Sequence, residues 1–250
     1  MPSGSNFRFG WADDLVENVR MSVDLTSHLR DFPFEPGRVN ARIVRGVDGR
    51  ELLQIRVELG MLQMEVAGRP DGGPSLLIGL GRAMKALDAA QAASLRLELV
   101  QFQQRAVAFL AVGRPRLAFV DADTVLGGME LMARHSLPQE REWVESARFS
   151  VLVLRTRCAV AVEVEAGNPR QAARAIESGL EALREAAERV GIAEGFDTLG
   201  DVIALRALRD SLVPQLPPAQ RSELESRLRA AILAENYELA AILRDELRLL

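Results

Sequence analysis

Two short segments with the same pattern lie in the middle of the chain and restrict how it can fold. Both read Gly-x-Pro-Arg-x-Ala, beginning at Gly113 and at Gly167, and each follows a run rich in apolar residues. Glycine is common just past the end of a helix, and proline is common in the first turn of the next one. The pattern therefore predicts two helical hairpins, with their turns at these two positions.

These turns resemble the turn between the two helices of a tetratricopeptide repeat. Their separation exceeds the 34 residues of the standard repeat, so the helices or loops must be longer. The resemblance implies a tetratricopeptide-like helical domain over residues 82–212, and we expect neighbouring elements to cap so short an array. Ser150–Val164 is rich in valine and could form a strand. Its length and its place in the repeat favour a buried helix.

A different apolar spacing in residues 38–72 predicts a small antiparallel sheet of two or three strands. Apolar and polar residues alternate from Leu53 to Leu59, which is the period of a half-buried strand. Gly46–Gly49 predicts a turn. The alternation changes parity after Gly60, which indicates a bulge or a sharp bend. We expect a helix to cover one face of this sheet.

Residues 1–37 are expected to form an N-terminal helix and an anchor. The helix is predicted over Trp11–Asp31, because two prolines and a glycine follow it and cannot continue it. Phe32 and Phe34 are expected to hold this segment on the sheet. Gly72–Gly81 is rich in glycine but lacks the other residues of a phosphate-binding or dinucleotide-binding motif. We interpret it as a linker into the helices.

Residues 219–250 predict a further helical hairpin with a break at Glu235–Asn236. Ser222 and Glu225 have the spacing of a capping box at the start of its first helix. Each helix carries one apolar stripe at helical spacing. The stripes comprise Leu224, Leu228, Ala231 and Ile232 in the first helix, and Ala240, Leu243, Leu247 and Leu250 in the second.

This terminal segment resembles the UVR motif, which is named for the excision-repair proteins UvrB and UvrC. The resemblance is carried by Leu228, Ala231, Glu235–Glu238, Ala240–Ala241 and Leu243–Leu247. The motif also occurs in some Clp-type ATPases and in activators of bacterial protein-arginine kinases. In that family it is a helical hairpin without a catalytic role, which pairs with another copy or with a partner protein. Tyr237 stands where phenylalanine is more usual.

The resemblance implies that the hairpin binds a partner. The side chains that it assigns to this role are Leu228, Tyr237, Ala240, Ala241, Leu243, Arg244, Asp245 and Leu247. A hairpin this short cannot bury enough apolar surface to fold firmly alone, which favours docking on another surface. The alternative is a plain helix pair packed on the body of the same chain.

These features predict a protein of the α+β class, mainly α, with a small antiparallel N-terminal sheet, a helical body and a C-terminal hairpin. We expect a non-enzymatic cytoplasmic adaptor that docks a partner or a second copy and needs no cofactor. Association with the motif's other occurrences suggests DNA repair or stress-linked proteolysis as the process. No binding to a membrane is expected.

Two other functions stay open. The first is nucleic-acid binding, because the β segment carries a set of basic residues that could meet phosphates: Arg38, Arg42, Arg45, Arg50 and Arg56. Acidic residues are mixed among them, and the net charge of −4 supplies no general attraction for nucleic acid. The second is an enzyme that uses carboxylates near the junction of sheet and helices: Glu58, Glu65, Asp71, Asp121 and Asp123. Asp121 and Asp123 could hold a divalent cation, although two carboxylates are few ligands for one.

The composition argues against several further classes. Cys158 is the single cysteine, so the chain has no disulfide framework, which fits a reducing compartment. His28 and His135 lie far apart and lack cysteine partners, so we expect no zinc site. No apolar run reaches the roughly 20 residues that span a bilayer. We also expect no secretory signal in the N-terminal residues.

Overall fold

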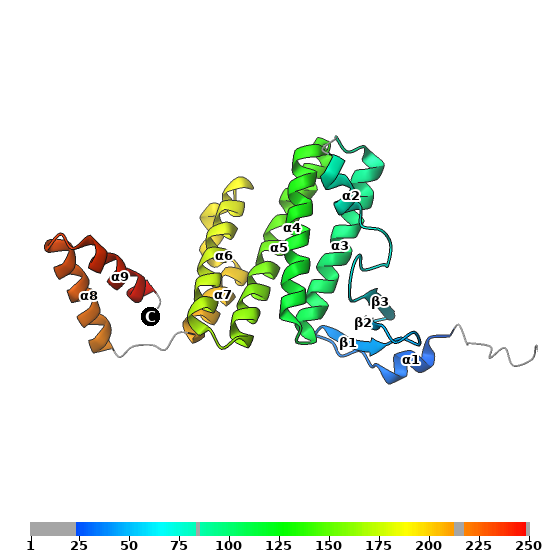
Figure 1. The fold of residues 1–250 in the computed structure, drawn as a ribbon, viewed down its shortest axis with the longest axis horizontal. Coiled ribbons are helices and arrows are strands. Elements are labelled where there is room, and N and C mark those ends of the chain that lie inside the picture. The colour runs from blue at the N-terminus through cyan, green and yellow to red at the C-terminus, as the bar shows by residue number, and fades with distance from the viewer. Residues whose placement is uncertain (1–23, 84–85, 213–217, 249–250) are drawn as a thin grey trace, which may run out of the picture.

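The computed structural model describes residues 24–83, 86–212 and 218–248. A short helix and a three-stranded sheet come first, a row of helices follows, and a helical hairpin comes last (Figure 1). This order confirms the predicted class, mainly helical with a small antiparallel sheet near the N-terminus. Within the described ranges, no helix is both long enough and apolar enough to cross a membrane.

The first element is the short helix α1 (Thr26–Asp31). Most of the predicted helix Trp11–Asp31 lies outside the described residues. Phe32 serves as the predicted anchor, because its ring lies 4.3 Å from the guanidinium carbon of Arg42 and its carbonyl accepts a hydrogen bond from Arg56. The prediction for Phe34 was wrong, since this side chain is exposed.

The sheet consists of β1 (Asn40–Arg45), β2 (Glu51–Val57) and β3 (Gly60–Glu65) in the antiparallel order β1-β2-β3. Gly60 is the first residue of β3 and pairs with Val57 across a two-residue turn. Of the two predicted alternatives, a bulge or a sharp bend, the structure therefore has a sharp bend, in the form of a hairpin turn. The apolar parity changes at Gly60 because the chain reverses there, and cross-strand pairing then decides which residues of β3 share a face with Leu53.

Part of the predicted linker forms the helix α2 (Leu76–Ala83). Its first turn is held by the buried carboxylate of Glu98, which accepts hydrogen bonds from Ser75 Oγ at 2.7 Å and from Leu76 N at 2.9 Å. Leu77 and Leu80 pack against the adjacent core. The glycines in this segment do not prevent a helix, because these tertiary contacts outweigh its weak local propensity.

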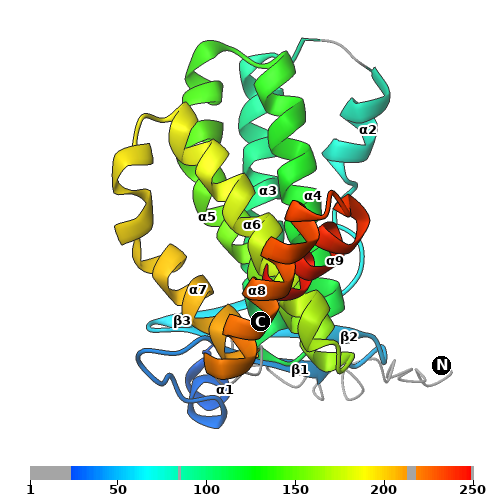
Figure 2. The same ribbon diagram turned by 90° about the vertical axis from the view of Figure 1, so that its left-hand side faces the viewer.

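Four long helices stand side by side: α3 (Ala89–Ala111), α4 (Pro115–His135), α5 (Pro138–Glu165) and α6 (Pro169–Arg189). Each packs on the next, and the 3-10 helix η1 (Ala193–Thr198) and α7 (Gly200–Leu212) pack on α6 (Figures 1 and 2). Ser150–Val164 lies within α5, so the helical interpretation of this segment is confirmed. The closer likeness to tetratricopeptide repeats stays a prediction.

The two repeated segments form the predicted turns. Gly113 and Gly167 have φ of +70° and +73°, a conformation that glycine adopts without strain. In each turn, the residue after the glycine donates a backbone hydrogen bond to a carbonyl of the helix's last turn, Phe109 at 2.8 Å and Glu163 at 2.9 Å. Pro115 and Pro169 then begin α4 and α6. The local sequence is sufficient for both reversals.

The buried side chains of the helical row and the sheet form three clusters. One lies between α3, α4 and α5 around Leu99 and Met129. A second joins the sheet to the same helices, with Leu53, Met64, Phe109 and Cys158 as members. A third joins α5, α6 and α7 around Ile176 and Phe196. The sheet is therefore attached to the α3 end of the row, and the last helices extend the other end.

Candidate interaction site in the C-terminal hairpin

The last two helices, α8 (Pro218–Leu233) and α9 (Tyr237–Arg248), pack against each other (Figures 1 and 2). The chain turns at Glu235, whose φ is 55°, and Asn236 N donates to the Ala231 carbonyl at 2.9 Å. Asn236 Oδ1 then accepts from Leu239 N at 3.1 Å and caps α9. The predicted break at these residues is confirmed. The predicted capping box was wrong, because α8 begins at Pro218 and Ser222 lies inside it.

The inner side of the hairpin, where α8 packs on α9, is formed mainly by small side chains. Ala231, Ala240 and Leu243 are buried, and Leu224 and Leu228 pack against them. Ala241 and Leu247 are half-buried. Neighbouring residues on a helix point about 100° apart, so Ala231 and Ile232 cannot both face α9. Alanine occupies the contact, which lets the two backbones approach closely.

The outer surface of the hairpin carries an unusual share of apolar side chains. Ile232, predicted to lie in the inner stripe, is instead 52% exposed. Tyr237 is 70% exposed and Ile242 is 58% exposed. We define the outer apolar set of the hairpin as Ile232, Leu233, Tyr237, Leu239 and Ile242, all of which are exposed.

The structure thus separates the predicted partner-binding residues into two groups. Leu228, Ala240 and Leu243 belong to the contact between the two helices, and Ala241 and Leu247 are half-buried. Tyr237, Arg244 and Asp245 lie on its surface, where Arg244 Nη2 and the adjacent Asp245 carboxylate form an ion pair at 3.0 Å. The second group is exposed to a partner, whereas in the first group Ala240 and Leu243 are buried and the other three residues are half-buried.

Sequence reasoning missed three members of the outer apolar set: Leu233, Leu239 and Ile242. A signal for two of them was present, because Leu239 and Ile242 each precede a seam residue by one position. Their spacing of three makes a second apolar stripe beside Ala240 and Leu243. An apolar face wider than the seam between two helices indicates an additional contact surface.

The arginines of the β segment are mostly engaged within the chain. Arg38 pairs with Glu35 at 2.8 Å, and Arg50 pairs with Asp48 and Glu65. Arg42 Nε donates to Gln54 at 2.9 Å, and Arg56 donates to several backbone carbonyls, among them Gly60. Arg45 is exposed at the end of β1. These contacts engage four of the five arginines within the chain, although the side chains of Arg38 and Arg50 are 67% and 59% exposed.

The carboxylates considered for catalysis do not converge. Asp121 and Asp123 lie two positions apart on α4 and therefore point to different sides. Asp121 is buried in an ion pair with Arg105, whereas Asp123 is on the surface and pairs with Arg155 at 2.9 Å. Burial raises the pKa of Asp121, against the opposing effect of the Arg105 hydrogen bonds. Asp121 is thus part of the core.

The remaining candidates lie near the sheet and serve its turns. Glu65 pairs with Arg50, and Glu58 is exposed in the turn between β2 and β3. Asp71 accepts from Gly73 N at 2.9 Å, and this hydrogen bond lowers the pKa of the Asp71 carboxyl. Over the residues that the structure describes, no group of three or more His, Cys, Asp or Glu side chains could hold a metal ion.

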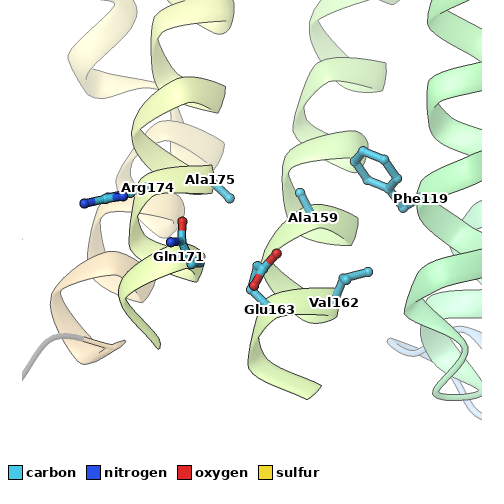
Figure 3. Close-up of a pocket in the computed structure, with 7 residues that line it drawn as sticks. All are labelled: Phe119, Ala159, Val162, Glu163, Gln171, Arg174 and Ala175. Atoms are coloured by element: carbon cyan, nitrogen blue, oxygen red, sulfur yellow. The ribbon is translucent and has the colours of Figure 1, made fainter. Parts of the chain in front are cut away.

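A groove runs between α4, α5 and α6 and encloses about 370 Å³. Its lining comprises Phe119, Ala159, Val162, Glu163, Gln171, Arg174 and Ala175. Figure 3 shows Ala175 directed toward α5, whereas the Arg174 side chain points away from Ala159 and Phe119. Glu163 accepts a hydrogen bond from Asn168 at 3.2 Å. Four of the seven lining residues are apolar, and the other three are Glu163, Gln171 and Arg174.

The fold and the hairpin together define a class: a helical body that carries a terminal two-helix module with an apolar surface. Residues 219–250 match the family model described as the UvrB/uvrC motif. The match spans the hairpin and confirms the resemblance carried by motif residues between Leu228 and Leu247. No curated protein and no solved structure matches the chain.

Proposed function

We propose that this protein is a non-enzymatic interaction protein that docks a partner, or a second copy of itself, through residues 219–250. The observation that carries the proposal is the outer apolar set of the hairpin. Five large apolar side chains within eleven residues are exposed there, beside a motif that matches the UvrB/uvrC family model. Exposed apolar side chains that lie this densely are typical of contact surfaces.

The small interior of the hairpin supports the same proposal. Only Ala231, Ala240 and Leu243 are fully buried among its described side chains. Burying apolar surface contributes about 25 cal/mol per Å², so two alanines and one leucine stabilise a helix pair weakly. Contact with another surface would supply the missing burial and would cover the outer apolar set.

The nucleic-acid and enzyme alternatives have less support. Four of the five arginines named for nucleic acid bind groups of their own chain. Among the carboxylates named for catalysis, Glu65, Asp71, Asp121 and Asp123 each bind a different group of the chain, and Glu58 is exposed in a turn. The motif's other occurrences suggest that the protein acts in the cytoplasm, in DNA repair or in stress-linked proteolysis. The identity of the partner would distinguish these two processes.

The experiment compares four forms of the full chain as bait in a cell lysate. They are the parent, a truncation ending at Pro217, Ile242→Asp and Ile203→Asp. Ile242 is 58% exposed on α9 and Ile203 is 53% exposed on α7, so the two substitutions place the same charge at equally exposed sites. Sedimentation of each purified protein at several concentrations measures self-association in parallel.

We expect the truncation and Ile242→Asp to lose the same bound proteins, or the same self-association, while Ile203→Asp keeps them. The lost proteins then name the process. If all four forms retain one set of proteins and one sedimentation behaviour, the hairpin is not the docking element and the proposal is wrong.

A further inference from the structure

The arginines of the helical body differ in whether other groups of the chain engage them. Within the described residues 86–212, most arginine side chains form an ion pair or donate a hydrogen bond. Those in this range that do neither are exposed and lie at the beginnings of α4 and α6: Arg114, Arg116, Arg170 and Arg174. Neither helix has an acidic residue in its first turn. Unpaired positive charge is therefore gathered at these two helix starts.

The groove between α4, α5 and α6 lies beside these arginines. α4 and α6 begin at the same end of the helical row (Figure 1). Phe119 of α4 and Arg174 of α6 line the groove. Arg116 precedes Phe119 by three positions, and Arg170 precedes Arg174 by four, so each pair shares one side of its helix. The groove thus has basic side chains at both edges and an apolar floor, which comprises Phe119, Ala159, Val162 and Ala175.

One acidic side chain in the groove restricts what it can bind. Glu163 of α5 lies between the two edges (Figure 3) and accepts a hydrogen bond from Asn168 Nδ2 at 3.2 Å. This carboxylate opposes a chain of phosphates along the floor, because like charges at close range repel each other. The groove therefore fits an apolar surface that is acidic at its two flanks.

The exposed side of α9 has this complementary pattern. Glu238, Leu239, Ile242 and Glu246 lie within about 100° of arc around the helix. Leu239 and Ile242 are exposed, and both glutamates are exposed without an ion pair among the described residues. Two apolar side chains are therefore flanked by a carboxylate toward each end of the helix.

The dimensions of the two surfaces agree. Glu238 and Glu246 lie about 12 Å apart along the axis of α9. Packed helices lie about 8–10 Å apart, so α4 and α6, which both pack on α5, are within about 20 Å of each other. Glutamate and arginine side chains are long enough to cover the difference. A helix lying across the groove therefore brings a carboxylate to each edge.

We propose that α9 of one copy of this chain lies across the groove between α4 and α6 of a second copy. Leu239 and Ile242 then pack on the apolar floor, and Glu238 and Glu246 pair with the arginines at its edges. Each chain carries both surfaces, so two copies can exchange hairpins reciprocally and form a closed dimer. Over the described residues, α8 and α9 pack on each other and not comparably on the body of their own chain. The inference rests on the proposed function and adds the surface that the hairpin binds.

Sedimentation equilibrium of the full chain, over a range of concentrations, tests the proposal with reversals of charge. The groove variant is Arg116→Glu with Arg170→Glu, and the α9 variant is Glu238→Arg with Glu246→Arg. A third protein combines all four substitutions. Glutamate near the beginning of a helix is favourable, so the groove variant should fold as the parent does.

The matched control is Arg134→Glu with Arg157→Glu, which changes the net charge as the groove variant does. Arg134 lies in the last turn of α4, far from its beginning, and Arg157 pairs with Asp201 of α7. The two side chains are 72% and 51% exposed, so neither substitution disturbs the core. Far-ultraviolet circular dichroism confirms that every variant keeps its helices.

We expect the parent to dimerise. The groove variant and the α9 variant should each weaken the dimer by about tenfold or more, because each places like charges together. The combined protein restores opposite charges across the contact and should recover most of the affinity, and the control should dimerise as the parent does. Added salt should weaken the parent dimer, since it screens exposed charges.

A parent that stays monomeric at every concentration overturns the proposal. If the groove variant of such a monomer shows faster hydrogen exchange in α9, the hairpin docks on its own chain instead. Weakening in the groove variant without recovery in the combined protein excludes a direct contact. Binding of fluorescein-labelled single-stranded DNA that the groove variant loses, without any dimer, assigns these arginines to nucleic acid and also overturns the proposal.

The same measurements separate this inference from the proposed function. A dimer that the groove variant leaves unchanged, and that Ile242→Asp dissociates, overturns the inference but keeps the hairpin as the docking element. A dimer that survives truncation at Pro217 contradicts both.

Discussion

Arg105 and Asp121 form a two-bond ion pair in the interior, with Nε–Oδ2 at 2.7 Å and Nη2–Oδ1 at 2.8 Å. Both side chains are 4% exposed. Arg105 Nη1 also donates to the Glu65 carbonyl at the end of β3, at 2.8 Å. One arginine on α3 therefore connects α4 to the sheet, and its charge is matched where water cannot reach it.

Removing one member of this pair should be far more damaging than removing both. Arg105→Met leaves the Asp121 carboxylate buried without its partner, and we expect a loss of about 3–5 kcal/mol in the free energy of unfolding. Arg105→Met with Asp121→Leu should recover most of that loss. Urea unfolding measures both.

The matched control is Arg155→Met, which breaks the surface ion pair between Arg155 on α5 and Asp123 on α4. Arg155 is 40% exposed and Asp123 is 58% exposed, so we expect a loss below about 1 kcal/mol. Similar losses for Arg105→Met and Arg155→Met would show that the buried pair has no special role.

Gly127 and Gly128 are adjacent on α4 and should respond to alanine with opposite signs. A Cβ at Gly128 would lie 2.3 Å from Leu99 Cδ2 in the core, so Gly128→Ala should destabilise the protein by about 1–3 kcal/mol. A Cβ at Gly127 meets nothing within 4 Å. Gly127→Ala should therefore stabilise the helix by up to about 1 kcal/mol. Thermal unfolding of the two variants measures both effects. Equal changes in stability for Gly127→Ala and Gly128→Ala would mean that the α3–α4 contact is looser than described.

Glu235 and Gly113 occupy the same position in two helix-ending turns, with φ of 55° and +70°. Glycine accepts this conformation more readily than glutamate does. We expect Glu235→Gly to stabilise the hairpin by about 0.5–1 kcal/mol, and Gly113→Ala to destabilise the body by about 1 kcal/mol. Hydrogen exchange of the α8 and α9 amides measures the first effect, and urea unfolding measures the second. Faster exchange in Glu235→Gly would contradict the assigned turn.

Cys158 should make stability fall at alkaline pH. Burial, with a smaller contribution from the Asp121 carboxylate, raises the pKa of the Cys158 thiol from 9.0 to about 12. The unfolded chain therefore loses this proton first, so the folded state is favoured fully below pH 9 and progressively less up to about pH 12. Between these limits the slope is about −1.4 kcal/mol per pH unit.

The check is urea unfolding between pH 8 and pH 11 for the parent and for Cys158→Ala. Other groups titrate equally in both proteins, so the difference between the two slopes isolates the thiol. Parallel slopes would place Cys158 in contact with solvent.

The candidate site was predicted in part because a helical seam is a local pattern. The spacing of Leu228, Ala240 and Leu243 placed them on the inner side of the hairpin, where they lie. Which of Ala231 and Ile232 faces α9 depends on how closely the two helices approach. The apolar periodicity of the sequence does not specify that distance. The exposed members of the motif, Tyr237, Arg244 and Asp245, were assigned by resemblance to the UVR motif and not from their environment.

Beyond the site, the sequence by itself determined the elements that short-range forces specify. The chain reverses at Gly113–Pro115 and at Gly167–Pro169. In each reversal, a glycine adopts positive φ and a proline begins the next helix. Alternating apolar residues set β2. These choices involve residues within one or two turns of each other, so their physical causes are readable along the chain.

Only the tertiary structure decided what depends on residues far apart in sequence. Hydrogen bonds to Glu98 hold the start of α2 within a glycine-rich segment. The pairing of Val57 with Gly60 decides between the two alternatives at this glycine, a bulge or a sharp bend, and gives a hairpin turn. Arg105 forms an ion pair with Asp121 on the next helix, so the Asp121 carboxylate is not available to bind a metal ion. Burial and charge pairing are properties of assembled neighbours, and no local pattern specifies which neighbours will meet.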